Sequence, residues 1–152
     1  LLLDWIQFRG RIRSNKAMLN RSDLRGMIKS LKAGETIWYA PDHDYGRKNS
    51  IFVPFFAVKE ACTTAGTRML LKSAPQTKVV PFSPIRNEDF SGYTVKISPA
   101  VDFSDCEDDV QTATKMNKVV EGEILNAIEQ YMWLHRRFKT RLNESDLNLY
   151  EA

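Results

Sequence analysis

The sequence predicts an α/β domain with three layers. Helical and strand-like segments alternate along the first half of the chain, and a hairpin candidate follows them. Such alternation is typical of domains that pack helices against a sheet. The chain has 152 residues, of which 43% are hydrophobic and 27% charged, so it can bury one ordinary core. No apolar run approaches the roughly 18–20 residues that cross a bilayer.

The clearest helix lies at residues 22–33, where apolar side chains recur at helical spacing. Ser22 is a suitable N-cap and Gly34 is a natural stop. Before this helix, apolar and basic residues alternate across residues 8–13, which would set the arginines on one side of an extended segment. The sequence therefore leads from a basic N-terminal segment into a helix.

Side chains that could carry chemistry concentrate directly after this helix. The β-branched and aromatic run at residues 36–40 predicts a buried strand, and Pro41 ends it because proline cannot continue a sheet ladder. The turn that follows presents Asp42, His43 and Asp44 together. Ligands of open α/β sheets bind at the carboxyl ends of strands, so this turn is the first candidate site.

Two carboxylates and an imidazole suit a metal site, acid–base chemistry or the organisation of a loop. A metal is weakly supported, because adjacent turn residues point in different directions and no other His or Cys lies nearby in the sequence. Asp side chains also stabilise turns by accepting hydrogen bonds from neighbouring backbone amides. We expect no metal here, and both the acid–base role and the structural role remain open.

The remaining segments predict further elements of both kinds. Residues 129–138 mix bulky aromatic and basic side chains, which fits either an amphipathic core helix with a charged rim or an interfacial surface. In chain order, the other expectations are an edge strand or hydrophobic loop at 51–56, a helix at about 58–73, a buried strand at 78–82, a hairpin turn at 87–92 before a strand at 93–98, a long helix at about 108–127 with an acidic start, and a loose tail at 143–152.

The net charge is only +3, but basic residues gather near both ends of the chain around an acidic run. Two separated basic clusters suit phosphates or an anionic membrane surface, whereas solvated faces and helix ends are the plainer explanation. Nucleic acid is not expected as a partner, because the aromatic residues fall mostly on core-like positions. The two cysteines have neither metal-ligand spacing nor the number needed for a disulfide framework, which favours a reducing compartment.

Four stretches carry most of the remaining information. They are Gly10-Arg11-Ile12-Arg13-Ser14-Asn15-Lys16, Trp38-Tyr39-Ala40-Pro41-Asp42-His43-Asp44-Tyr45-Gly46, Val79-Val80-Pro81-Phe82 and Glu129-Gln130-Tyr131-Met132-Trp133-Leu134-His135-Arg136-Arg137-Phe138-Lys139-Thr140-Arg141. In this order they resemble the lipid A biosynthesis acyltransferases, the late acyltransferases of Gram-negative bacteria. The resemblance runs from Trp5 to Arg141.

This resemblance implies a glycerol-3-phosphate-acyltransferase-like three-layer domain with a mostly parallel or mixed central sheet, here incomplete. It also implies a membrane-associated enzyme at the cytoplasmic face of the inner membrane. That enzyme would move a fatty acyl group from acyl carrier protein to a hydroxyacyl chain of Kdo(2)-lipid IV(A), with no cofactor. The Ala-Pro-Asp-His-Asp-Tyr-Gly and Leu-His-Arg-Arg-Phe stretches look closer to the lauroyl-type enzymes than to the myristoyl-type enzymes.

The catalytic signature of that family is His-x-x-x-x-Asp/Glu, with the histidine as general base. The fifth residue after His43 is Lys48, and the fifth after His135 is Thr140, so neither histidine matches. We therefore expect residues 1–152 to be the C-terminal part of a single acyltransferase domain, with the dyad and an N-terminal membrane helix upstream. This part is expected to be inactive alone.

The resemblance also implies roles for single residues. Arg11 is expected to bind an anionic group of the substrate and to support the transition state, and Asp42 is expected to support the site, paired with Arg11. A guanidinium suits phosphates or the Kdo carboxylates. Further substrate contacts are expected from Arg13, His43, Asp44, Val80 and Pro81.

A separate hypothesis concerns four basic residues near the end of the chain, which could dock the acyl donor. Acyl carrier protein is strongly acidic, so cations near the end of the chain would steer it toward the enzyme. Anionic lipid headgroups are the competing partner. The alternative function is a non-catalytic module that binds an anionic lipid surface or an acidic partner. The four residues are Arg136, Arg137, Lys139 and Arg141.

Overall fold

The computed structural model describes residues 2–20 and 22–150, and the chain divides into two compact units, Leu1–Ile37 and Trp38–Ala152. Helices and small antiparallel sheets make up the described residues, so the chain is α/β in its mix of elements. All strands of the described residues belong to the second unit, which also contains the predicted turn site.

The first helix of the first unit is α1 (Leu2–Ile12), which replaces the extended segment predicted at residues 8–13. In a helix, residues two apart point to different sides, so the row of arginines expected from the alternation is not formed. Arg9 and Arg11 lie in the last turn of α1, where cations are favoured by the helix dipole. Arg13 lies just past the end of the helix.

The second helix is α2 (Leu24–Lys32), which confirms the helix predicted from the apolar stripe. Its N-cap is Asp23 instead of Ser22, because the Asp23 carboxylate accepts a hydrogen bond from the Gly26 backbone N at 2.9 Å. Such a bond satisfies one of the backbone donors that a helix start leaves unpaired. Gly34 follows the helix with a φ of +77°, a conformation that favours glycine.

Residues 36–40 form no strand, so that sequence prediction is wrong. A strand needs a neighbour to satisfy its backbone N–H and C=O groups. Each sheet of the described residues is a two-stranded hairpin, and residues 36–40 pair with neither. Trp38 is 69% exposed instead of buried.

The first hairpin of the second unit pairs β1 (Ser50–Phe55) with β2 (Val58–Thr64) in antiparallel register. Of the two alternatives for residues 51–56, the edge strand is the one that forms. The hairpin contradicts the single helix predicted over residues 58–73. The first half of that range pairs with β1, and only α3 (Gly66–Ser73) is helical. The β-branched and small residues of β2 suit a half-buried sheet face.

The second hairpin pairs β3 (Phe82–Arg86) with β4 (Tyr93–Ile97), as the turn between them predicts. The strand predicted at residues 78–82 is reduced to an isolated bridge between Val79 and Val101. Short turns can join only antiparallel neighbours. The described residues therefore form two antiparallel sheets, and not the mostly parallel or mixed central sheet that the resemblance implied.

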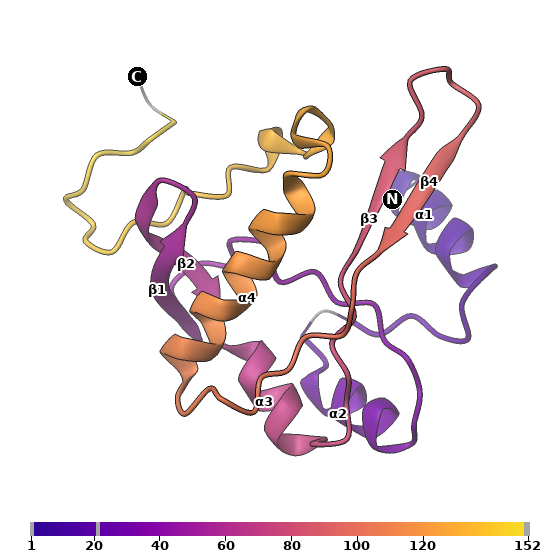
Figure 1. The fold of residues 1–152 in the computed structure, drawn as a ribbon, viewed down its shortest axis with the longest axis horizontal. Coiled ribbons are helices and arrows are strands. Elements are labelled where there is room, and N and C mark those ends of the chain that lie inside the picture. The colour runs from indigo at the N-terminus through magenta and orange to yellow at the C-terminus, as the bar shows by residue number, and fades with distance from the viewer. Residues whose placement is uncertain (1, 21, 151–152) are drawn as a thin grey trace. The chain divides into compact units, whose positions relative to one another are not determined.

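The longest helix, α4 (Asp109–Ile124), confirms the helix predicted with an acidic start, and it packs along the β1–β2 hairpin (Figure 1). Phe55, Ala61 and Ile124 form a buried cluster between the helix and this hairpin. Aromatic side chains from the following segment pack against the same cluster. The core of the second unit thus sits between α4 and the first sheet.

After α4, two short 3-10 helices replace the helix considered for residues 129–138. They are η1 (Ile128–Gln130) and η2 (Trp133–His135), and irregular chain follows them to residue 150. Among the residues that the structure describes, no helix is long and apolar enough to cross a membrane.

Candidate active site

The turn at residues 41–46 is tied to the C-terminal segment by two acidic side chains. The first is Asp44, which is only 4% exposed. Thr140 donates hydrogen bonds to both carboxylate oxygens of Asp44, from its backbone N to Oδ2 at 2.8 Å and from Oγ1 to Oδ1 at 2.9 Å. Gly46 N donates to Oδ1 at 2.9 Å. These three donors occupy the Asp44 carboxylate, so this residue holds the turn in place.

The second tie is Asp42, whose side chain is half-buried. The Tyr131 hydroxyl donates a hydrogen bond to Asp42 Oδ2 at 3.2 Å, although the two residues lie 89 positions apart. His43 Nε2 lies 3.7 Å from the other carboxylate oxygen, Oδ1. Burial, and then the neighbouring Asp42 charge, raise the pKa of Tyr131, which keeps the phenol in its protonated, donating form.

The two histidines of the chain lie against each other in this site. The ring centroids of His43 and His135 are 3.9 Å apart, with the ring planes tilted by 44°. Tyr45 extends the group of rings, with its centroid 5.8 Å from that of His43. The His135 Nε2 atom is buried without a hydrogen-bond partner. The site therefore combines a carboxylate, a phenol and two imidazoles, which are groups suited to proton transfer and to orienting a substrate.

Arg137 lies in the core instead of on the surface. Its guanidinium donates from one terminal N to the Cys62 carbonyl at 2.7 Å and from the other to Thr63 Oγ1 at 3.0 Å. The guanidinium also lies over the Phe55 ring, 4.6 Å from its centroid. Burial lowers the pKa of Arg137 from its ordinary value. Because these contacts occupy the side chain, Arg137 is not available to a docking partner.

The other three predicted docking cations differ in accessibility. Arg136 and Lys139 are exposed, and the Arg136 guanidinium lies 5.9 Å from the centroid of the Tyr150 ring. Arg141 is half-buried, and its Nε has no hydrogen-bond partner. The docking hypothesis therefore depends mainly on Arg136 and Lys139.

Arg11 and Arg13 are exposed residues of the first unit, whereas Asp42 belongs to the second. The pairing of Arg11 with Asp42 therefore stays a prediction. Val80 and Pro81 lie in the second unit, in the short link between the Val79–Val101 bridge and β3. Their role as the apolar lining of a substrate pocket also stays a prediction.

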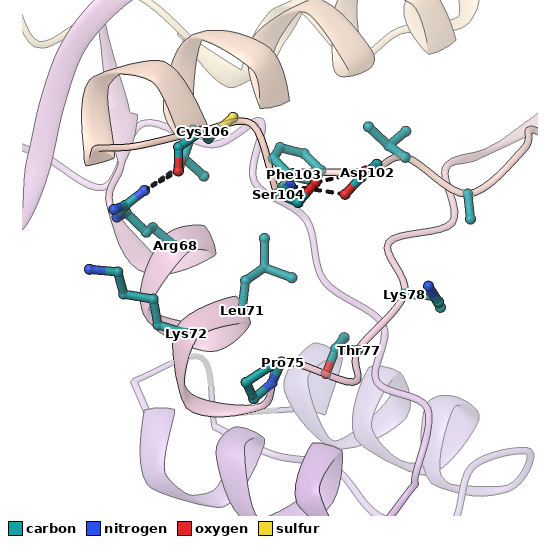
Figure 2. Close-up of a pocket in the computed structure, with 13 residues that line it drawn as sticks. Arg68, Leu71, Lys72, Pro75, Thr77, Lys78, Asp102, Phe103, Ser104 and Cys106 are labelled. Atoms are coloured by element: carbon teal, nitrogen blue, oxygen red, sulfur yellow. Dashed lines mark hydrogen bonds between the residues drawn. The ribbon is translucent and has the colours of Figure 1, made fainter.

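A cavity of about 540 Å³ lies elsewhere in the second unit, between α3 and the loop that precedes α4 (Figure 2). Arg68 closes one side by donating hydrogen bonds to the carbonyls of Cys106 at 2.8 Å and Asp108 at 3.0 Å. On the other side, the Asp102 carboxylate accepts hydrogen bonds from the backbone N and hydroxyl of Ser104. Arg68 thus holds the loop to α3, whereas Asp102 stabilises a turn within the loop. None of the predicted site residues lines this cavity.

Across residues 2–20 and 22–150, no group of three or more His, Cys, Asp or Glu side chains is placed to hold a metal ion. The structure adds one residue that the sequence did not single out, Tyr131. Its only sequence signal was its place in the aromatic and basic stretch before residue 141. No spacing rule connects it to Asp42 across 89 residues.

Comparison with known proteins places the chain in a family. Residues 1–140 match the family described as bacterial lipid A biosynthesis acyltransferase. The chain is 63% identical over 150 residues to a lipid A biosynthesis acyltransferase of Haemophilus influenzae, an alignment that covers 99% of this chain and 48% of that protein. It is 56% identical over 140 residues to the lipid A biosynthesis lauroyltransferase of Escherichia coli, covering 92% of this chain and 45% of that protein.

A third relative is the lipid A biosynthesis palmitoleoyltransferase of Escherichia coli, with 48% identity over 147 residues, 96% of this chain and 47% of that protein. The chain thus spans about half the length of the curated relatives it matches. The family match covers most of the chain, and it agrees with the four stretches that carried the resemblance. The chain belongs to the bacterial lipid A biosynthesis acyltransferase family.

Proposed function

We propose that the full-length protein transfers a fatty acyl group from acyl carrier protein to a hydroxyacyl chain of a lipid A precursor, Kdo(2)-lipid IV(A). The family match over residues 1–140 is the observation that carries this proposal. The reaction would take place at the cytoplasmic face of the inner membrane, where a water-soluble donor meets a membrane-bound acceptor.

In this reaction, the acceptor hydroxyl oxygen attacks the thioester carbonyl carbon of the acyl donor. A new C–O ester bond forms, the C–S bond breaks, and the thiol of the carrier leaves. A general base takes the hydroxyl proton and passes it to the leaving sulfur. The resemblance to the family implies that this base would be the histidine of a His-x-x-x-x-Asp/Glu dyad. Neither histidine of residues 1–152 has a carboxylate at that spacing.

The residues of this chain would bind and orient the substrate. Arg11 would bind an anionic group of the acceptor with its planar guanidinium and stabilise developing negative charge. Asp42 would hold a substrate group in place together with His43, and Arg13 would add a second cation for the acceptor. Val80 and Pro81 would supply apolar surface for an acyl chain. We leave Asp44 out of this set because its carboxylate is already occupied by three donors.

The acyl group is proposed to be lauroyl. The Ala-Pro-Asp-His-Asp-Tyr-Gly and Leu-His-Arg-Arg-Phe stretches support this choice, and one of the relatives is named a lauroyltransferase. A relative of similar coverage is named a palmitoleoyltransferase, so the donor must be tested directly. Transfer rates from lauroyl, myristoyl and palmitoleoyl carrier protein to the same acceptor would identify it, and a faster rate with either other donor would exclude lauroyl.

The test of the proposed function measures acyl transfer by the full-length protein with Asp42→Asn and Arg11→Ala. Each change should lower kcat/KM by about 100-fold, because positioned charges act on the charge that develops in the transition state. Lys48→Ala, at an exposed residue of the loop after the site, is the matched control and should leave the rate unchanged. Absence of transfer by the unmodified protein would overturn the proposal.

The alternative function is a non-catalytic module that binds an anionic lipid surface. One observation favours it: Leu134 is 94% and Met132 70% exposed, close in sequence to the exposed cation Arg136. Apolar side chains beside cations suit the headgroup region of a membrane. Binding to vesicles containing phosphatidylglycerol, without any acyl transfer by the full-length protein, would support this function over the enzymatic one.

A further inference from the structure

We infer that Tyr131 is the positioning residue that holds the Asp42 carboxylate in its working orientation. The inference rests on the proposed function, in which Asp42 supports the substrate site. It adds a residue from a distant part of the chain, because Tyr131 lies between η1 and η2, 89 positions after Asp42.

The contacts of Asp42 place a different group at each carboxylate oxygen. Tyr131 donates to Oδ2 at 3.2 Å, and His43 Nε2 lies 3.7 Å from Oδ1. The terminal torsion of an Asp side chain has a broad energy minimum, so its orientation depends on such contacts. The hydrogen bond from Tyr131 therefore selects one orientation, in which Oδ1 is the oxygen that faces the histidine.

The Tyr131 side chain is itself held firmly. Its ring packs edge-on against Trp133, with centroids 4.8 Å apart and planes at 78°, and it packs against the buried cluster of Phe55, Ala61 and Ile124. A phenol is protonated at physiological pH, so Tyr131 is a donor to the carboxylate, and its raised pKa extends this protonated form to higher pH. A rigid aromatic donor fixes its acceptor better than a flexible side chain would.

A separate contact holds the backbone of the turn. Thr140 donates two hydrogen bonds to Asp44, at 2.8 Å and 2.9 Å, and these do not involve Tyr131. Loss of the Tyr131 hydroxyl should therefore free the Asp42 carboxylate while the turn keeps its place. This arrangement predicts an effect on catalysis that is separable from folding.

The experiment compares Tyr131→Phe with unmodified full-length protein in the acyl-transfer assay. We expect kcat to fall by about 10-fold to 100-fold, the usual effect of losing a group that orients a catalytic residue. The KM for the acyl carrier protein donor and the thermal midpoint should stay unchanged. Tyr39→Phe is the matched control, because it removes a half-buried phenol that contacts Thr67, 3.4 Å away, instead of Asp42.

A double-mutant cycle separates positioning from a general loss of structure. In an Asp42→Asn background, Tyr131→Phe should cause no further loss of kcat, because the group that it positions is already altered. The inference would be overturned if Tyr131→Phe kept a kcat within twofold of the unmodified protein while Asp42→Asn was impaired. That result would leave the proposed function unaffected. Absence of transfer by the unmodified protein, or an active Asp42→Asn variant, would overturn the role of Asp42 and this inference with it.

Discussion

At the scale of single residues, Arg137 shows that consecutive basic residues in a sequence are not necessarily all exposed to solvent. Arg136 and Arg137 are neighbours in the sequence, yet one is exposed and the other is only 2% exposed. Burying a guanidinium is costly unless its N–H groups find acceptors. The Cys62 carbonyl and the Thr63 hydroxyl accept from its two terminal N atoms, and both belong to β2, whereas its buried Nε has no hydrogen-bond partner. Arg137 therefore fastens the C-terminal segment to the first hairpin.

We predict that Arg137→Ala lowers the free energy of unfolding by about 3 kcal/mol, because it leaves a cavity and an unpaired buried carbonyl. Arg137→Lys should also destabilise, since an ammonium cannot reproduce the two-pronged contact. Lys139→Ala, an exposed neighbour, should change the stability by no more than about 0.5 kcal/mol. Urea denaturation followed by circular dichroism measures all three. Equal stability of the Arg137→Ala and Lys139→Ala variants would contradict a structural role for Arg137.

At the scale of secondary-structure elements, the sequence predicted a helix correctly where a capping residue marks the start of that helix. The acidic run before α4 predicted a capped start, and Asp108 accepts a hydrogen bond from the Gln111 backbone N at 2.7 Å. Gln111 in turn accepts from the backbone N of Glu107 at 2.9 Å. This reciprocal arrangement is close to a capping box, and it satisfies donors that the helix start leaves unpaired.

Asp108→Ala should therefore destabilise the protein by about 1 kcal/mol, the usual cost of losing an N-cap. Asp108→Asn retains a side-chain oxygen that can accept the same bond, so it should remain close to the unmodified protein. Thermal unfolding of the two variants provides the comparison. If the Asn variant lost as much stability as the Ala variant, charge rather than capping would explain the effect.

The β1–β2 hairpin shows an element that local signals missed. Its turn contains Phe56 with a φ of +49°, a conformation usually taken by glycine or asparagine. The backbone N of Phe56 donates a hydrogen bond to the Glu121 carboxylate of α4 at 2.6 Å, and the Phe56 ring packs against Phe55. Contacts with α4 therefore stabilise a turn that has no turn-forming residue. Because the sequence shows no turn signal at this point, it predicted a helix over the residues that form β2.

At the scale of the whole molecule, one buried thiol and two half-buried phenols make the stability depend on pH at alkaline values. Burial raises the pKa of Cys62, Tyr39 and Tyr131, so the folded chain keeps these protons to a higher pH than the unfolded chain. Their contribution to stability is fully present below the ordinary thiol and phenol pKa values. It is lost as the pH rises above about 9 toward the folded-state values.

The midpoint of thermal unfolding should accordingly be constant between about pH 7 and 8 and fall between about pH 9 and 10.5. Cys62→Ser removes one of these groups and should flatten the early part of that fall. Differential scanning fluorimetry across the range measures the effect. A midpoint that did not change up to about pH 10.5 would show that these groups ionise equally in both states.

The exposed cations near the end of the chain are predicted to steer the acidic acyl carrier protein. Reversing charge with Arg136→Glu and Lys139→Glu together should raise the KM for the acyl donor by about 10-fold at low salt, and less at high salt. Lys59→Glu, at an exposed position of β2, is the matched reversal and should leave KM unchanged. Weaker binding to anionic vesicles with an unchanged KM would assign these cations to lipid headgroups instead.

The sequence by itself determined the family, the helices α2 and α4, the second hairpin and the location of the acidic turn. Each of these depends on motifs, caps or periodicities that act within a few residues. Only the tertiary structure decided that Asp44 binds Thr140, that Tyr131 reaches Asp42 and that Arg137 enters the core. These contacts join residues 75 to 96 positions apart. They depend on how α4, the first hairpin and the C-terminal segment pack against one another, and a short sequence pattern carries no information about that packing.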